Sequence, residues 1–276
     1  MTTFTSSNFS NAHAPTVPLS APRGRVTIGG VTPAPSPTSI AERDRLAEYE
    51  RWLSSPSLRA IATRWLLGEP GAFLLNTPVL RLPSELRLDG SERVLDIGCG
   101  RGALLRQLDR QLRFARDPVG LDSSRALLRL AGRDEARAGR PSALLRASAT
   151  ALPFAAASFT LVLCGHLLRH LDDAAVRDLL DEIWRVLAPG GLAVLWEFAP
   201  TGRRLLDGWN RRWLSPGVAA PRLRTTAQLL ALAGAAGFPF GADAELRPFL
   251  APPIPRASVL IGRPPDDFEP AAAAHP

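Results

Sequence analysis

The sequence of 276 residues contains no lysine, one methionine, one tyrosine and two cysteines. The two cysteines, Cys99 and Cys164, are too few for a disulfide framework, which excludes a small disulfide-rich secreted protein and favours a reducing, cytoplasmic compartment. Because lysine is absent, all 33 basic residues are arginine, and against 26 acidic residues they give a formal net charge of +7. These arginines are distributed along the whole chain, which disfavours a nucleic-acid partner.

Long apolar runs are also missing. The longest uncharged stretch of the central chain, 147–168, is interrupted by serine, threonine, proline and histidine, so it does not provide the roughly 20 apolar residues that a bilayer span requires. The uncharged residues 1–22 lack the basic and apolar regions of a signal peptide. The sequence therefore predicts no membrane partner. The four histidines and two cysteines show no metal-ligand spacing, so no metal is expected.

Composition divides the chain into four parts. Proline, serine and threonine occupy 19 of the first 40 positions, which predicts a disordered leader over residues 1–38. From Ser39, a candidate helix cap, residues 39–90 are expected to form a helical cap, in which Leu46, Tyr49 and Leu53 share one face. The main domain is expected over residues 91–263, followed by a disordered tail over 264–276.

Short apolar runs then alternate with amphipathic segments. The expected strands are 93–97, 118–121, 142–146, 159–164, 192–198, 244–250 and 258–261. The expected helices are 102–114, 123–138, 172–187 and 226–236. This alternation predicts an α/β fold with a mostly parallel sheet that is covered by helices on both faces.

The strongest chemical signal is the sequence VLDIGCGRG at 94–102. A buried strand leads into a glycine-rich turn and then into a helix, so that backbone N–H groups and a closely approaching chain are available to a ligand. Asp122 follows the next expected strand, 20 residues after Gly102. An acid at that place is positioned to accept hydrogen bonds from the two ribose hydroxyls of a nucleoside.

This run resembles motif I of the class I S-adenosylmethionine-dependent methyltransferases. Three further segments resemble family motifs in the same order: ALPF at 151–154, FTLVL at 159–163 and RVLAPGG at 185–191. The resemblance implies a Rossmann-like three-layer sandwich around a seven-stranded sheet, S-adenosyl-L-methionine as cofactor, and methyl transfer to a small organic acceptor. It is closest to the small-molecule branch that includes quinone-biosynthesis methyltransferases.

The resemblance also assigns residues. Asp96 would orient the methionine end of the cofactor, Asp122 would hold the ribose, and Ser148 with Ala149 would border the adenine. The remaining cofactor residues that it implies are Gly98, Cys99, Gly100, Gly102, Ser123 and Cys164. The sequence departs from the family at Ser148, where an acid usually contacts the adenine amino group, and at Thr160, where the fourth strand usually has aspartate.

Other functions remain open at this point. The pattern Gly98-x-Gly100-x-x-Ala103 also fits a dinucleotide-binding fingerprint, although Asp96 and the Pro-Gly-Gly turn disfavour a dehydrogenase. A catalytically silent methyltransferase fold that acts as a binding or regulatory protein is the main alternative, and Ser148 is its support. Both cysteines have packing as their simpler interpretation.

Two residues are candidates for catalysis. His166 follows the fourth expected strand and is a candidate general base, with packing or acceptor contact as the alternatives. Glu197, at the end of the fifth expected strand, is the second candidate. His170 is expected to be structural. Arg203 and Arg204 are candidates for binding an anionic acceptor, although a solvated basic surface explains them equally simply.

Overall fold

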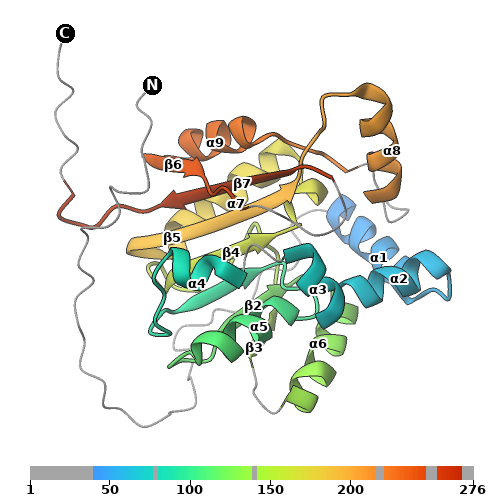
Figure 1. Ribbon diagram of the computed structural model, residues 1–276, viewed down its shortest axis with the longest axis horizontal. Coiled ribbons are helices and arrows are strands. Elements are labelled where there is room, and N and C mark those ends of the chain that lie inside the picture. Colours follow the sequence, from blue (N-terminus) through green and yellow to red (C-terminus); the bar gives the residue numbers. More distant parts are fainter. Residues whose placement is uncertain (1–39, 77–79, 139–141, 215–220, 247–253, 269–276) are drawn as a thin grey trace.

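The computed structural model describes residues 40–76, 80–138, 142–214, 221–246 and 254–268 (Figure 1). Its strands are β1 (Val94–Ile97), β2 (Val119–Asp122), β3 (Ala143–Arg146), β4 (Phe159–Gly165), β5 (Leu187–Phe198), β6 (Phe240–Asp243) and β7 (Arg256–Gly262). Its α-helices are α1 (Ile40–Ser54), α2 (Leu58–Leu66), α3 (Glu69–Asn76), α4 (Leu82–Glu85), α5 (Ala103–Leu112), α6 (Arg125–Ala138), α7 (Asp173–Val186), α8 (Arg204–Leu214) and α9 (Thr226–Ala235). The predicted leader, the cap at Ser39 and the last eight residues of the predicted tail lie outside the described residues.

The strands form one seven-stranded sheet in the order β3-β2-β1-β4-β5-β7-β6. The first five strands in this order are parallel to one another, whereas β7 is antiparallel to both β5 and β6. The predicted Rossmann-like, mostly parallel sheet is therefore confirmed. The strand order reverses between β1 and β4, and ligands of open α/β sheets bind outside the carboxyl ends of the strands at such a point.

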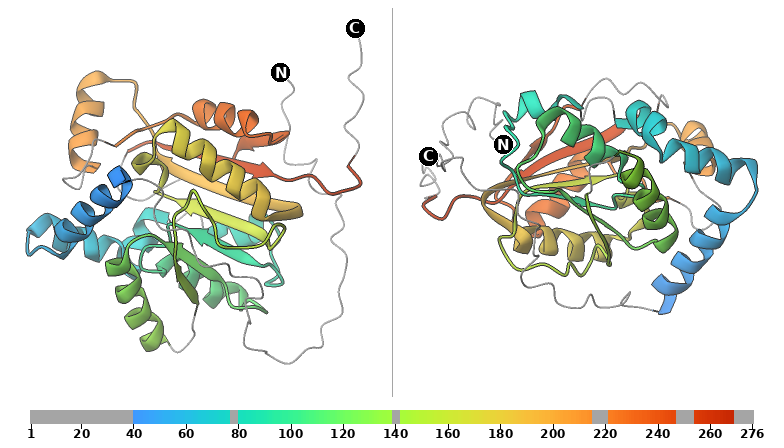
Figure 2. Two further views of the ribbon diagram at one scale, coloured as in Figure 1. Left: turned by 180° about the vertical axis from the view of Figure 1, so that it is seen from behind. Right: turned by 90° about the horizontal axis from the view of Figure 1, so that it is seen from below.

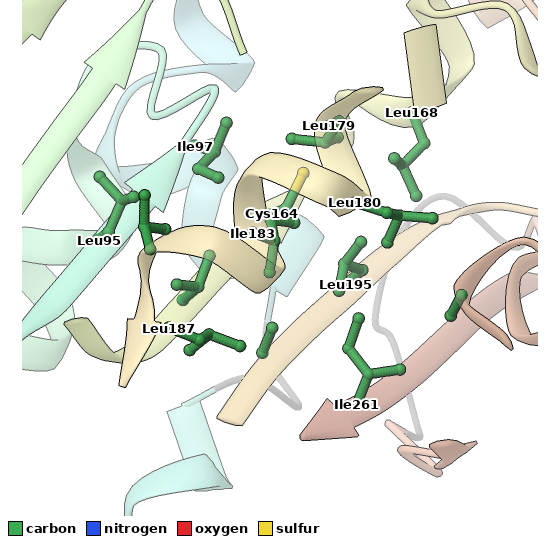
Figure 3. Packing of buried hydrophobic residues seen from close by; sticks show 14 of the residues in the cluster. Leu95, Ile97, Cys164, Leu168, Leu179, Leu180, Ile183, Leu187, Leu195 and Ile261 are labelled. Carbon is green, nitrogen blue, oxygen red and sulfur yellow. The ribbon is translucent and has the colours of Figure 1, made fainter. Parts of the chain in front are cut away.

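Alternation along the strands divides the core into two layers. Leu95, Ile97, Val162 and Leu195 face a cluster that includes the apolar side of α7, and Figure 3 shows this packing around Leu179 and Ile183. Their neighbours in sequence turn to the opposite face and pack on α4 and α5. The residues of this second layer include Val94, Leu161, Leu163, Val194 and Trp196. The views from behind and from below show the sheet between these helices (Figure 2).

Helices α1, α2 and α8 lie together at the end of the sheet toward which β5 points (Figure 1). Arg101, in the turn between β1 and α5, holds α2 there because its Nη1 donates to the carbonyl oxygen of Arg64 at 2.7 Å. Arg106 forms ion pairs with Glu69 at the start of α3 and with Glu135 of α6, each at 3.1 Å. These contacts fix the helices that precede the sheet against the turn that follows β1.

The sequence prediction was wrong in several places. Strand β6 occupies Phe240–Asp243, because pairing with β7 stabilises a segment whose glycine and aspartate have low strand propensity. Residues 244–246 of the predicted strand 244–250 are not in a strand, and 247–250 lie outside the described residues. Strand β5 begins at Leu187, so it includes the Pro-Gly-Gly segment that was expected to be a turn. Helices α3 and α4 lie within the predicted helical cap but were not predicted individually, and α8 was not predicted. None of the helices in the described ranges is long and apolar enough to cross a bilayer.

We predict that Gly165→Ala destabilises the protein. A Cβ at Gly165 would lie 2.3 Å from Cζ2 of Trp196, whose ring is fully buried and whose Nε1 donates to Asn76 Oδ1 at 2.9 Å. Because such overpacking of a filled core costs about 1–3 kcal/mol, chemical denaturation should show a loss of that size. Gly132→Ala in α6 is the matched control: a Cβ there meets no atom within 4 Å, and the change should be neutral or stabilising. Equal stability of the two variants would contradict the prediction.

Candidate active site

The turn after β1 is built from three glycines in the left-handed region. Gly98, Gly100 and Gly102 have φ values of 78°, 55° and 68°, which side chains with a Cβ seldom adopt. The turn is fixed to β2 because the Gly98 N–H donates to the carbonyl oxygen of Leu121 at 2.7 Å. Gly100 is buried, but a Cβ there would meet no atom within 4 Å, so the space beside this part of the turn is not filled by other side chains.

Asp122 connects this turn to the end of β2. Its Oδ2 accepts from the Gly100 N–H at 2.9 Å, and its Oδ1 accepts from the Ser124 N–H at 2.8 Å. Each carboxylate oxygen keeps a second acceptor position, so the group can still bind two neighbouring hydroxyls. Burial raises the pKa of Asp122 to about 6, although the two backbone hydrogen bonds oppose the shift.

Asp96, on β1, is a second buried acid beside the turn. Only 3% of its surface is exposed, and burial together with the charge of Asp122 raises its pKa to about 7. No arginine or histidine within the described ranges forms an ion pair with it. A buried carboxylate without a countercharge is suited to bind a ligand that carries a positive group.

This arrangement predicts a pH-dependent effect of Asp96→Asn on the ligand-free protein. The pKa of Asp96 is about 7 in the fold against an ordinary value of 3.8, so the fold prefers the protonated acid. The wild type should therefore lose stability as pH rises from about 4 to above 7, and the variant should lose on the order of 1–4 kcal/mol less. Thermal melts at pH 5 and pH 8 test this. A variant that is not stabilised relative to wild type at pH 8 would contradict it.

The residues that the resemblance assigns to the adenine follow β3. Ser148 is 4% exposed, its Oγ lies 2.9 Å from Thr150 Oγ1, and Ala149 beside it is partly buried. Ser123 follows Asp122 directly, and its carbonyl oxygen accepts from Arg146 Nε at 3.0 Å. The fold thus brings these three residues to the same edge of the sheet as Asp96, Asp122 and the glycine turn.

Both cysteines pack inside the protein. Cys164 is fully buried in the core beside α7 (Figure 3), so its thiol supports packing rather than contact with a cofactor. The Sγ of Cys99 lies 2.9 Å from the position that a Cβ on Gly120 would take, and its side chain therefore points at β2. Burial raises the pKa of both thiols well above the usual value, which argues against a nucleophilic role.

Two residues of α1 reach this edge and were missed as functional residues. Glu50 Oε1 accepts from Ser124 Oγ and from the Ala126 N–H, each at 3.1 Å, so α1 is fixed to the start of α6. Burial raises the pKa of Tyr49 to about 12, with the charge of Asp122 adding to the shift and that of Arg169 opposing it. Apolar spacing identified Tyr49 only as part of a helix face.

His166 lies directly after β4 with a φ of 58°, a left-handed conformation that is uncommon outside glycine and often marks a functional site. Its neighbour Leu167 lies against the glycine turn, 3.2 Å from where a Cβ on Gly98 would be. Both ring nitrogens of His166 are buried and lack hydrogen-bond partners among the described residues. Burial lowers the pKa of His166, only partly offset by Glu197, so the imidazole is neutral and able to accept a proton.

Glu197, at the end of β5, is 1% exposed and ionised. Its carboxylate accepts from Arg169 Nη1 at 3.1 Å and from the backbone N–H groups of Arg169 and Phe198. Burial opposes ionisation, but the charge of Arg169, the contact with His166 and the hydrogen bond from the Arg169 N–H hold the pKa of Glu197 well below its usual range. Its Oε1 is 3.6 Å from His166 Nδ1, which is an electrostatic contact longer than a hydrogen bond. A carboxylate held in this way is a poor general base.

Arg256, at the start of β7, completes the cluster and was also missed. Its guanidinium lies 3.9 Å from the centroid of the Phe198 ring, and the same ring is 4.7 Å from that of His166. Burial lowers the pKa of Arg256 to about 10. No sequence pattern pointed to Arg256, because only the antiparallel pairing of β7 with β5 places it opposite Phe198.

The remaining candidates lie elsewhere. Arg203 and Arg204 are exposed at the start of α8, so their role in binding an acceptor stays a prediction. Arg224, from the same arginine-rich segment, is 6% exposed and pairs with Asp173 at 2.6 Å, which makes it structural. The ring of His170 lies 6.3 Å from that of Tyr49, and the residue is exposed rather than packed as expected.

Comparison with known proteins agrees with this geometry. Residues 94–191 match a family described as "Methyltransferase domain". The chain is 32% identical over 136 residues to a 2-phytyl-1,4-naphtoquinone methyltransferase of Synechococcus elongatus, covering 47% of this chain and 57% of that one. It is 34% identical over 125 residues to a demethylmenaquinone methyltransferase of Lactiplantibacillus plantarum, covering 45% and 52%. The chain thus spans about half the length of these curated relatives.

Solved structures show the same fold. The S-adenosylmethionine-dependent methyltransferase SibL in its apo form has a TM-score of 0.61 at 22% identity, covering 78% of this chain and 62% of that one. A Haemonchus contortus phosphoethanolamine-type N-methyltransferase, in complex with phosphomonomethylethanolamine and S-adenosylhomocysteine, has a TM-score of 0.54 at 22% identity, covering 70% and 45%. These structures confirm the Rossmann-like fold that the motifs predicted, and the match over residues 94–191 is to a methyltransferase domain.

Proposed function

We propose that this chain, whose residues 94–191 match a methyltransferase domain, is a class I S-adenosylmethionine-dependent methyltransferase that methylates a small quinone-type acceptor with S-adenosyl-L-methionine as cofactor. The observation that carries the proposal is the meeting of two half-sites at one edge of the sheet. One consists of the glycine turn with Asp96 and Asp122, and the other of His166 with Glu197. Leu167 lies against Gly98 and so joins the two.

The first half-site fits the cofactor. Asp122 keeps acceptor positions for a ribose, and its orientation is fixed by two backbone N–H groups. Asp96 is a buried acid that needs a positive partner, and an amino-acid ammonium or a sulfonium supplies one. Bound here, the cofactor supplies a methyl group that is already activated by its sulfonium sulfur. The protein's own task is then to align the acceptor and exclude water.

The second half-site suits an acceptor that loses a proton. His166 Nε2 is buried, neutral and without a partner among the described residues, so it can accept a proton from a hydroxyl or an acidic carbon of the acceptor. Arg169 and Arg256 place two positive charges beside a single Glu197, and the excess favours an acceptor that becomes an anion. Glu197 is a positioning residue in this proposal, acting on His166 and Arg169.

Transfer of label tests the proposal. The chain is incubated with S-adenosylmethionine labelled in the methyl group and with a demethylated naphthoquinol, the acceptor class named for the relatives. Label should enter the quinol fraction with wild type and not with a His166→Asn and Asp122→Asn double variant. Cofactor binding without any labelled product from a panel of quinols would reject the quinone-type acceptor.

A silent fold is the second candidate, and one observation favours it. Ser148 stands where the family usually has an acid at the adenine, and its hydroxyl is in contact with Thr150. Calorimetric titration with S-adenosylmethionine separates the two possibilities. Binding in the micromolar range supports the enzyme, whereas no heat at millimolar cofactor supports a scaffold that has lost the site.

A further inference from the structure

Helix α8 turns its apolar side toward solvent. Leu205 is 91% exposed, Leu206 46% and Trp209 60%, whereas Asn210 is only 5% exposed and faces inward. A surface helix of a globular protein has the opposite arrangement, with apolar residues against the core. Single exposed apolar residues are common, but a whole helix face that is exposed in this way indicates a surface that binds something apolar.

A second helix in contact with α8 shows the same property. Leu58, Ile61 and Trp65 of α2 are 85%, 47% and 52% exposed and lie at i, i+3 and i+7, on one helix face. The two helices touch because Arg59 Nη2 donates to the carbonyl oxygen of Arg212 at 2.9 Å. They lie at the same end of the molecule (Figure 1). We call the exposed apolar residues of these two helices the apolar end surface. It consists of Leu58, Ile61 and Trp65 of α2 and Leu205, Leu206 and Trp209 of α8.

The charged residues of α8 are mainly basic. Arg204, Arg211 and Arg212 are all exposed. The single acid of the helix, Asp207, accepts hydrogen bonds from the N–H and the hydroxyl of Thr201 at 2.7 and 2.6 Å. A helix with leucine and tryptophan on one side and arginine on the other has the composition of one that lies in the interface of an anionic bilayer.

We propose that the apolar end surface docks on an anionic lipid bilayer, with α8 lying in the headgroup region. Tryptophan and arginine both suit this region, because each combines an apolar body with a polar end. A second copy of the chain is a poorer occupant, since a two-fold contact through α8 would bring the same arginines against each other. The proposal does not depend on methyl transfer.

The docking differs from the sequence prediction of no membrane partner. Polar and charged residues interrupt the apolar residues of α8, so no window of the sequence is apolar enough to predict a span. None of the described helices is long and apolar enough to cross a bilayer, and the proposal concerns association with the bilayer surface. The carboxyl ends of β4 and β5 lie at this end of the molecule, so docking would also bring the proposed acceptor site close to lipid (Figure 1).

Vesicle flotation of the full chain tests the proposal. Vesicles of phosphatidylcholine alone are compared with vesicles that also contain phosphatidylglycerol. The bound fraction on anionic vesicles should be at least about tenfold higher and should fall as salt is added, because exposed charges are screened. Tryptophan emission should shift to shorter wavelength on binding. Absence of flotation on anionic vesicles would overturn the proposal.

Variants locate the surface. Leu205→Ser with Trp209→Ser, and separately Arg211→Glu with Arg212→Glu, should each lower the bound fraction at least about tenfold. Arg129→Glu with Arg133→Glu, the same charge change at exposed positions of α6, is the matched control and should lower it much less. Unchanged flotation in both α8 variants overturns the proposal. So does a wild-type dimer in light scattering that the serine variant converts to monomer, because a second copy would then cover the surface.

Discussion

Replacing His166 by asparagine should lower the rate of methyl transfer by roughly 10²–10⁴, the usual range for the loss of a general base. Cofactor affinity should stay within about twofold, because His166 belongs to the acceptor side of the proposed site. Asparagine is the better first substitution, since it tolerates the left-handed backbone that His166 adopts with a φ of 58°. His166→Ala should lose a similar factor in rate and some stability as well.

The pH profile separates catalysis from packing. Burial lowers the pKa of His166 below its ordinary 6.5, with Glu197 opposing the shift and Arg169 and Arg256 adding to it. The wild-type rate should therefore rise with pH through a group that titrates below 6.5 and be level at neutral pH, and this rise should be absent in the variant. A His166→Asn enzyme that keeps the wild-type rate would show that alignment alone is sufficient and that no base is used.

Glu197→Gln is the companion measurement. The backbone N–H groups of Arg169 and Phe198 donate to different oxygens of Glu197, so glutamine, with one acceptor oxygen, can keep only one of these hydrogen bonds. It also removes the charge that opposes the lowered pKa of His166. The expected result is a further lowering of the pH at which the rate rises, with a smaller loss of rate than in His166→Asn. If Glu197 were itself the base, Glu197→Gln and His166→Asn would lower the rate by comparable factors. Both variants would then also lose the rise of the rate with pH.

Much of the fold was predictable because its signals are local. Buried parallel strands read as apolar runs, and the helix that became α7 repeats valine and leucine at helical spacing. The errors occur where pairing outweighs propensity. Strand β6 contains Gly241 and Asp243 and exists because β7 lies beside it. Helix α8 has leucine, tryptophan and arginine in a pattern that is helical, but its apolar side does not face a core.

The site was predictable in one half and not in the other. The glycine turn and Asp122 occupy one strand-turn-helix unit and the next strand, so their spacing in sequence determines their meeting in space. Tyr49, Glu50 and Arg256 come from α1 and β7, far away in sequence, and only tertiary packing brings them in. Ionisation also depends on packing: Glu197 was a plausible base until its contacts with Arg169 were known.

Replacing Asp122 by alanine should weaken cofactor binding by roughly 1–3 kcal/mol, which corresponds to about a 5- to 150-fold higher Kd. The loss has two physical sources. The charge-assisted hydrogen bonds to the ribose disappear, and the N–H groups of Gly100 and Ser124, which now donate to the carboxylate at 2.9 and 2.8 Å, lose their acceptor. Calorimetric titration with S-adenosylmethionine measures the change directly.

Asp122→Asn separates the loss of the ribose hydrogen bonds from the loss of the acceptor for the turn, and Asp117→Asn is its control. Asparagine at 122 keeps one acceptor oxygen for the turn but turns an amide donor toward the second N–H, so its Kd should lie between those of wild type and Asp122→Ala. Asp117, exposed just before β2, receives the same change without touching the turn, and the Asp117→Asn variant should bind the cofactor like wild type.

Because burial raises the pKa of Asp122 to about 6, wild-type affinity should also weaken as pH falls below 6, and the alanine variant should lack this dependence. An unchanged Kd in Asp122→Ala would show that the nucleoside does not bind at this loop.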